Sequence, residues 1–542
     1  MIKKWTIFLG LLLLLSLPFF IRKSGEAIDA DTDDTVVILT GHNENIRFEL
    51  GNGFRRWYRQ RTGRTVFIDW RYLGGVSEIV RYLDSVYTSE FRYLWEKELG
   101  RPWTQEVNQI FVNRTLHKSK WLTPLHREIY EEFYKSKISS EIDIFFGGGM
   151  TDFIIQADLG TLVDVGFLRE HPELFNDEAI PQHFAGAELW DQNGRWFGQA
   201  FSIFGILCNV DVLHSHGLEK KDVMQWEQIT DPRLFGLVAL TDPTKSSAIL
   251  KAFEMIVQQQ MMFALLRDGN SSKKMDQEKE SIERGWLRGL QVIQLISANT
   301  RYYADGPSKM ILDIANGNSV LGLIVDFMGR AQCDEERKRS GRDRLEFILP
   351  QNGSGISPDP IAILRGAPNV EVAKLFLEYV LSEEGQKIIA FRAKTEGGPV
   401  HHTLFRPPVL RQIYGKEYDS FRAFSENLYA ELSELAYRPE RTEGVYNALK
   451  WIIKLAFIIP HRELVEAWQA IIVARKEGRE DAAEMAQAVL SDFSKFEYTN
   501  VNQTLSSILR TTDSEKALLL QREIVSRFQR QYKHAKHVAQ SN

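Results

Sequence analysis

The segment at residues 142–153 constrains the fold most, because an apolar run stops abruptly at three consecutive glycines and a helical pattern follows. The spacing of one helix face continues through Met150, Phe153 and Ala157, which predicts a strand, a bare loop and a helix in succession. Glycine lets the backbone approach a ligand closely, and the free N–H groups of a helix start favour an anionic or polar group. A tight turn that serves packing alone explains the segment equally well.

Length and composition are those of an ordinary globular protein. The chain has 542 residues, of which 44% are hydrophobic and 26% are charged, and this length predicts one to three domains. The formal net charge is −5, and no basic face or arm of the kind that binds nucleic acid is visible. The two cysteines, Cys208 and Cys333, have no partners at zinc-site spacing. They could form a disulfide or remain two separate thiols.

The first residues predict export. Lys3 and Lys4 precede an apolar run at residues 5–21, which is the pattern of a signal peptide. Arg22 and Lys23 follow the run directly, and its length is at the short limit for a membrane-spanning helix. Residues 1–27 are therefore expected to be a signal peptide or a membrane anchor. Either outcome places the protein in the periplasm, free or held at the inner membrane.

Strand, loop and helix patterns alternate through the first part of the chain. Apolar runs at 35–40, 65–70 and 142–146 are each followed by a polar or glycine-containing loop and a helical pattern. This alternation predicts a largely parallel sheet with helices on both faces. A long aromatic and charged stretch at 88–137 interrupts it and is expected to be a helical insertion.

A second α/β unit repeats the same pattern and then gives way to helices. Predicted strands at 237–240, 300–303 and 319–325 are followed by strands between 345 and 363 that re-enter the first unit. No strand pattern appears after this return. The expected division is lobe 1 at 35–204, lobe 2 at 205–345, a return to lobe 1 at 346–404 and a C-terminal helical extension at 405–542.

Three loops of one design lie between a predicted strand and a predicted helix, at 147–149, 241–247 and 305–309. If the crossovers between lobes lie near Phe204 and Leu349, these loops converge on one cleft. Their N–H groups, hydroxyls and ammonium group would suit a small anion or a phosphorylated solute. The candidate ligand-binding residues are Gly41, His42, Asn43, Gly148, Gly149, Met150, Asp242, Thr244, Lys245, Ser246, Ser247, Asp305, Ser308 and Asp326.

Several segments, in this order and spacing, resemble the extracellular solute-binding proteins of ABC transporters. They are the FFGGG sequence, the DPTKSS loop, the block from 303 to 330, PIAI at 360–363 and the helical stretch at 373–391. The resemblance covers about residues 35–400 and is close to the iron(III) and organophosphate binders. It implies a type II periplasmic binding fold, two α/β lobes with two crossover segments. It also implies a monomer without a cofactor that passes a small-molecule solute to an ABC permease.

The resemblance bears on the choice between an anion and iron(III). Iron-binding relatives place a tandem tyrosine just after the strand that matches 321–325, where this chain has Asp326, Phe327 and Met328. We therefore expect an anionic solute and assign no metal ligand, with iron(III) or a metal chelate as the alternative. Asp326 could face the cleft or be a buried carboxyl satisfied by the backbone.

Other possible metal ligands have simpler explanations. Tyr302 and Tyr303 form a tandem pair upstream of the Asp305 loop, and core packing is the favoured interpretation. Histidines that could ligate a metal, or simply lie at helix ends and on the surface, are His214, His216, His401 and His402.

Two rival functions use the same scaffold. An enzyme is one, because fold does not fix function, but no GxSxG, HExxH or phosphate-loop signature appears. A membrane-held ligand sensor is the other, and the N-terminal segment and the helical extension leave it open. Neither catalytic residues nor a nucleic-acid partner are predicted.

Overall fold

The computed structural model describes residues 32–114, 122–268, 275–431, 437–502 and 515–541. The predicted signal segment at 1–27 lies outside these residues. The described residues form one nine-stranded sheet in the order β2-β1-β3-β11-β6-β9-β7-β8, with β10 paired to β6. The strands are β1 (Asp34–Thr40), β2 (Val66–Arg71), β3 (Ile144–Phe146), β6 (Phe197–Asn209), β7 (Val238–Thr241), β8 (Thr300–Ala304), β9 (Leu321–Val325), β10 (Leu345–Ile348) and β11 (Ile356–Ile363).

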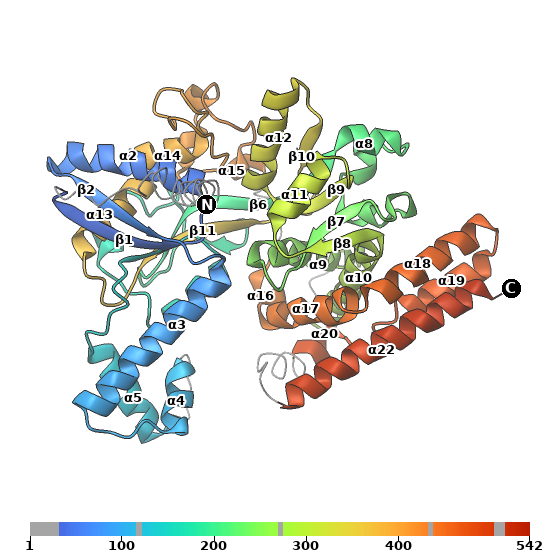
Figure 1. Ribbon diagram of the computed structural model, residues 1–542, viewed down its shortest axis with the longest axis horizontal. Coiled ribbons are helices and arrows are strands. Elements are labelled where there is room, and N and C mark those ends of the chain that lie inside the picture. Colours follow the sequence, from blue (N-terminus) through green and yellow to red (C-terminus); the bar gives the residue numbers. More distant parts are fainter. Residues whose placement is uncertain (1–31, 115–121, 269–274, 432–436, 503–514, 542) are drawn as a thin grey trace, which may run out of the picture.

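Strand β6 belongs to both lobes. Its first half pairs antiparallel with β11 as far as Ile203, and from Phe204 onward it pairs with β9 and β10. The return connection runs from β10 in lobe 2 to β11 in lobe 1. The predicted α/β fold with two crossover segments is confirmed, and Figure 1 shows lobe 1 on the left and lobe 2 on the right.

Lobe 1 carries helices on both faces of its strands. Helices α2 (Glu44–Thr62), α13 (Val370–Leu381) and α14 (Glu383–Ala390) share one core, in which Phe54 packs edge-on against Phe376. The other face is covered by α3 (Val76–Tyr93), the π-helix η1 (Leu94–Glu98), α4 (Gln105–Val112), α5 (Pro124–Lys135) and α6 (Met150–Asp158). Short elements complete the lobe: α7 (Phe167–Glu170) and the hairpin of β4 (His183–Phe184) and β5 (Ala187–Glu188).

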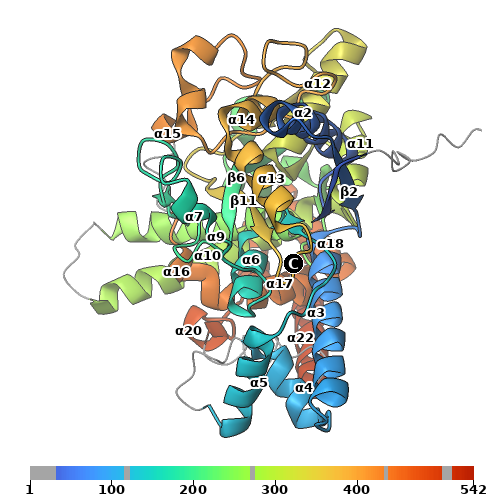
Figure 2. The same ribbon diagram turned by 90° about the vertical axis from the view of Figure 1, so that its left-hand side faces the viewer.

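The stretch predicted as a helical insertion lies in a protrusion. Both views place α4 and α5 at the end of the molecule opposite to α12 (Figures 1 and 2). Phe91 and Phe111 stack in its core at a centroid distance of 4.2 Å, and Phe133 packs against both. The protrusion starts inside α3, which runs unbroken from Val76, so no chain break marks the predicted boundary at residue 88.

Lobe 2 is built around two long helices, α9 (Ser247–Arg267) and α10 (Met275–Asn299). Its other elements are α8 (Val210–Ser215), the 3-10 helices η3 (Lys220–Val223), η4 (Trp226–Thr230) and η5 (Pro232–Leu234), α11 (Pro307–Ala315) and α12 (Asp326–Ser340). Among the described residues, the stretch Ile249–Arg267 is the one long and apolar enough to cross a membrane. Two thirds of its most apolar window is buried, and it packs in the core of lobe 2.

The stretch predicted as a C-terminal extension divides into two parts. Its first part, up to Tyr429, packs into the core of lobe 1 through Val409, Ile413 and Phe424. Its elements are the short helices η6 (Arg411–Tyr414), η7 (Lys416–Tyr418) and α15 (Leu428–Glu431). These turns are too short and irregular to give a helical period in the sequence.

The second part consists of helices that pack onto lobe 2 (Figure 1). They are α16 (Pro439–Thr442), η8 (Glu443–Val445), α17 (Tyr446–Ile452), the π-helix η9 (Ile453–Ile458), α18 (His461–Lys476), α19 (Glu480–Leu490), α20 (Tyr498–Asn500) and α22 (Glu515–Gln540). We call residues 437–541 the C-terminal helices. Trp286 of α10 donates to the Phe496 carbonyl at 2.7 Å, and Trp468 of α18 donates to Asn299 at 2.9 Å. The C-terminal helices and lobe 2 therefore share one core.

Candidate functional site

The two lobes face each other across a cavity of about 160 Å³. Lobe 1 contributes the start of α2 and a segment beside it, with Asn43, Asn45, Ile46, Thr403 and Leu404. Lobe 2 contributes α11 and α12, with Ile311, Phe327, Met328, Ala331, Gln332 and Glu335. Helix α12 begins directly after β9, and α2 begins after the short loop that follows β1. The cavity thus lies outside the carboxyl ends of strands, where open α/β sheets bind ligands.

The loop after β1 holds its two polar side chains differently. Asn43 caps α2, because its Oδ1 accepts a hydrogen bond from Ile46 N at 3.1 Å, and it lines the cavity. His42 is buried, with Nδ1 3.0 Å from Thr40 Oγ1 and Nε2 2.7 Å from Asp359 Oδ2. His42 therefore fixes the loop from inside lobe 1 and does not line the cavity.

Asp359 is the centre of a buried polar network that the sequence did not reveal. Its Oδ2 accepts hydrogen bonds from Arg406 at 2.7 Å and Gln199 at 2.9 Å besides the His42 contact, and its Oδ1 accepts one from Gly148 N at 2.8 Å. Burial by itself would raise the pKa of this carboxyl, but Arg406, His42 and the hydrogen bonds hold the pKa well below its usual range. The network ties the loops after β1 and β3 to β11.

Two of the three glycines after β3 contact this network. Gly147 has φ +83°, and a Cβ placed on it would lie 2.4 Å from the His42 ring. Gly147 N donates to the Pro360 carbonyl, and Gly148 N is used by Asp359. The N–H groups of Gly149, Met150 and Thr151, at the start of α6, have no acceptor among the described residues. This segment therefore packs against His42 and also presents a helix start with free N–H groups.

The polar side chains of the loop after β7 bond within the loop and to the start of α9. Asp242 Oδ1 accepts hydrogen bonds from Thr244 N at 2.9 Å and Thr244 Oγ1 at 2.6 Å, and Ser246 caps α9 through Ile249 N. Lys245 points to solvent and pairs with Asp305 at 2.6 Å, where the Asp305 side chain is 84% exposed. The Lys245 ammonium, which the sequence predicted to bind the solute, therefore lies on the surface. The following helix begins at Ser247, and Ser308, near the start of α11, is exposed.

A different lysine approaches the same loop from the C-terminal helices. Lys454 Nζ donates to Asp242 Oδ2 at 2.5 Å. Burial would raise the pKa of Asp242, but Lys454 and Thr244 hold the pKa below its usual value. One helical turn earlier, Lys450 lies close enough to Asp152 of α6 for their charges to interact. The sequence could have pointed to these two lysines, because they stand four residues apart in a largely apolar stretch.

Asp326, at the start of α12, is fully buried. Its Oδ1 accepts a hydrogen bond from Ile203 N at 3.3 Å, and its Oδ2 has no hydrogen-bond partner among the described residues. Burial raises the pKa of Asp326 to about 7, although Arg330 and Arg406 act to lower it. The carboxyl faces the junction of the lobes rather than the cavity, where its neighbour Phe327 is part of the wall.

The residues considered as metal ligands have other partners. Tyr303 donates to Ser297 Oγ at 2.7 Å, and Tyr302 donates to Asp313. His401 and His402 are exposed on the return segment, where their backbone N–H groups bind Glu49. Across the described ranges, no group of three or more His, Cys, Asp or Glu side chains is placed to hold a metal ion. The two cysteines of this part of the chain are free thiols.

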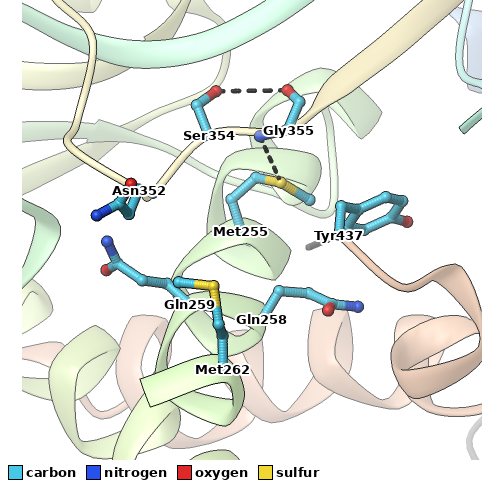
Figure 3. Close-up of a pocket in the computed structure, with 9 residues that line it drawn as sticks. Met255, Gln258, Gln259, Met262, Asn352, Ser354, Gly355 and Tyr437 are labelled. Atoms are coloured by element: carbon cyan, nitrogen blue, oxygen red, sulfur yellow. Dashed lines mark hydrogen bonds between the residues drawn. The ribbon is translucent and has the colours of Figure 1, made fainter. Parts of the chain in front are cut away.

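A second cavity lies beside the crossover from β10 to β11. Figure 3 shows Met255, Gln258, Gln259 and Met262 of α9, the crossover residues Asn352, Ser354 and Gly355, and Tyr437 from the C-terminal helices. Its volume of about 20 Å³ has room for about one water molecule, which is too little for a solute. The crossover is held here by Gly355 N against Met255 Sδ and by Trp226 Nε1 donating to the Gly353 carbonyl at 2.6 Å.

Comparison with known proteins assigns the family. The sequence profile described as "Bacterial extracellular solute-binding protein" matches residues 138–414, just over half of the chain. The chain belongs to this family. An uncharacterised protein of Haemophilus influenzae is 26% identical over 254 residues, which cover 46% of this chain and 62% of that protein. The phosphoglycerate transport regulatory protein PgtC of Salmonella typhimurium is 23% identical over 226 residues, 41% of this chain and 48% of PgtC. The match thus spans about half to three fifths of these relatives.

Solved structures of solute-binding proteins align with the chain at low identity. The periplasmic binding protein AfuA of Actinobacillus pleuropneumoniae, with fructose-6-phosphate bound, aligns with a TM-score of 0.39 and 17% identity over 66% of this chain and 82% of AfuA. A ferric binding protein of Campylobacter jejuni aligns with a TM-score of 0.43 and 16% identity over 76% of this chain and 99% of that protein.

In this member of the solute-binding family, the predicted site residues do not all meet. Asn43 lines the cavity between the lobes. The start of α6, with Gly149 and Met150, has free N–H groups. Asp242 forms an ion pair with Lys454. His42 and Asp326 are buried beneath these loops, and Lys245, Asp305 and Ser308 are exposed beyond them.

Proposed function

We propose that the chain is the substrate-binding component of an ABC import system. It captures a small anionic or phosphorylated solute between its lobes and delivers it to a permease in the inner membrane. The observation that carries this proposal is the cavity with walls from both lobes, which are joined by two crossovers. Rotation about two such connections closes the lobes on a solute by a hinge motion.

The proposed class of solute follows from polar groups beyond the carboxyl ends of β3 and β7. The free N–H groups at the start of α6 favour an anion, and Lys450 and Lys454 add positive charge. One relative, PgtC, is named for phosphoglycerate transport, and phosphoglycerate is an anionic phosphate ester. We further propose that the protein works in the periplasm as a monomer, free or anchored by residues 1–27, and that it binds and delivers its solute without catalysis.

A panel of solutes tests this proposal by thermal shift and calorimetry. The panel contains phosphate esters, phosphonates, carboxylates, polyamines and ferric chelates. A solute at 100 times its dissociation constant adds about 2.7 kcal/mol to the free energy of unfolding, which raises the melting temperature measurably. We expect a phosphate ester or another small anion to do so. Stabilisation by ferric chelates alone would support the iron alternative, and no stabilisation by any anion would overturn the proposal.

A ligand sensor is the second candidate, and the printed name of PgtC as a transport regulatory protein favours it. Measurements of solute uptake and of transporter induction distinguish the two functions. Deleting the gene should abolish uptake of the solute by cells that express the transporter constitutively if the protein delivers it. Unchanged uptake together with lost induction of the transporter would favour the sensor.

A further inference from the structure

The short helix pair α17 and η9 carries two cations in an otherwise apolar segment. Lys450 and Lys454 are four residues apart and therefore lie on one face of the helix. Their neighbours along the chain, including Ile452, Ile453 and Leu455, are buried in the core shared with lobe 2. A lysine in such a segment is costly to bury unless its charge is used.

Lys454 is bonded to a carboxylate of lobe 2, and the charge of Lys450 interacts with a carboxylate of lobe 1. Lys454 donates to Asp242, which follows β7 in lobe 2 and whose side chain is only 5% exposed. Lys450 interacts with Asp152, in the first turn of α6 in lobe 1. One helix face therefore carries a lysine bonded to the loop after β7 and a lysine near the first turn of α6, which follows the loop after β3.

We propose that Lys450 and Lys454 are binding residues for the negatively charged group of the solute, and that Asp152 and Asp242 neutralise them while the site is empty. This inference rests on the proposed function and names the residues that select an anion. The C-terminal helices then contribute binding residues in addition to the cavity walls from α2, α11 and α12.

The chemistry of these groups fits a phosphate or carboxylate. A lysine ammonium is a compact point charge that binds phosphate well. The N–H groups of Met150 and Thr151 open the same helix turn that holds Asp152, so an anion near Lys450 also benefits from the start of α6. The Lys454 side chain remains 27% exposed while bound to Asp242, so it is not fully enclosed.

A purely structural role would give the same interactions, so the test needs a substitution for which the two roles predict opposite changes in affinity. Under our proposal, Asp152→Asn removes a carboxylate that competes with the solute for Lys450, and binding of an anion should become tighter. If the pair only holds α17 against α6, the same substitution should leave the affinity unchanged or weaken it.

The experiment is calorimetry on the full chain with 3-phosphoglycerate, glycerol 3-phosphate and inorganic phosphate as probes. Loss of one charged hydrogen bond corresponds to a roughly 10- to 100-fold weaker dissociation constant, which we expect for Lys450→Gln and for Lys454→Gln. Lys454→Arg should stay within about tenfold of the wild type because it keeps the charge. Lys476→Gln, on the exposed end of α18, is the matched control and should bind like the wild type.

The outcomes are distinct. Wild-type affinity in both folded glutamine variants would overturn this inference and leave the proposed function standing. A wild type that binds no anionic probe, nor any anion of the wider panel, would overturn both. If Lys454→Gln fails to fold because Asp242 is left unpaired, Lys450→Gln and Asp152→Asn still decide the question, since opposite changes in affinity are required.

Discussion

Lys454 donates a hydrogen bond of 2.5 Å to Asp242 and so joins residues that are 212 positions apart in the sequence. The contact links the C-terminal helices to the loop after β7. Around it, the C-terminal helices bury residues from Val445 to Ala539 in the core of lobe 2. These helices are part of the lobe and not an appendage to it.

Removing the C-terminal helices should therefore unfold lobe 2. A chain that ends at residue 431 exposes the apolar faces of α9 and α10, which the full chain buries. We expect aggregation, or a loss of cooperative thermal unfolding and of the near-ultraviolet circular dichroism signal. A chain shortened only by residues 541–542 is the control. A soluble truncated chain with the melting temperature of the wild type would contradict the shared core.

Asp359→Ala should be strongly destabilising. Arg406 is 1% exposed and would lose the carboxylate that neutralises it, which typically costs about 3–5 kcal/mol. The matched control is Asp69→Ala in the same lobe, whose pair with Arg71 is largely exposed and should contribute less than about 1 kcal/mol. Urea unfolding measures both. Equal effects of the two substitutions would refute a stabilising role for the Asp359 network.

Gly147→Ala tests whether the His42 ring crowds the glycine loop. The new Cβ would meet the ring at 2.4 Å, and the backbone has φ +83°. Gly63→Ala is the control, because Gly63 has φ +74° and nothing lies within 4 Å of its Cβ position. We expect a loss of about 1 kcal/mol for Gly63→Ala from the backbone alone. Gly147→Ala should lose about 1–3 kcal/mol more from overpacking. Similar losses would place His42 away from this loop.

Asp326 makes stability depend on pH in a defined direction. Its pKa in the folded protein is about 7, above the ordinary value of 3.8, so the folded state holds the proton more tightly than the unfolded chain. Its contribution to stability is complete below about pH 4 and is lost as the pH rises to about 7, up to roughly 4 kcal/mol at 1.4 kcal/mol per unit.

Asp326→Asn isolates this contribution, because asparagine does not titrate. The stability of the variant relative to the wild type should increase between about pH 5 and pH 8, as measured by urea unfolding at each pH. The Asp359 carboxyl, with its lowered pKa, stabilises the fold throughout this pH range and loses its contribution only in more acidic solution, so it adds no pH dependence here. A constant difference between the variant and the wild type would show that Asp326 is already ionised at pH 5.

The sequence predicts this fold well where local patterns decide it. The apolar runs before Gly41 and Gly147 each mark the junction of a strand and a helix by spacing alone. The contact between His42 and Asp359 joins residues 317 positions apart, and no local pattern encodes it. For the same reason the sequence offered Lys245 as the cation of the β7 loop, whereas tertiary packing brings Lys454 there.

The binding of an anionic solute between the lobes is tested most directly by the distance between them. Spin labels at Arg61 of α2 and Leu312 of α11, both exposed, report this distance by electron–electron double resonance after Cys208 and Cys333 are replaced by alanine. Adding a phosphate ester that stabilises the protein should shorten the distance between the labels and narrow its distribution. An unchanged distribution at saturating phosphate ester would contradict capture of the solute between the lobes.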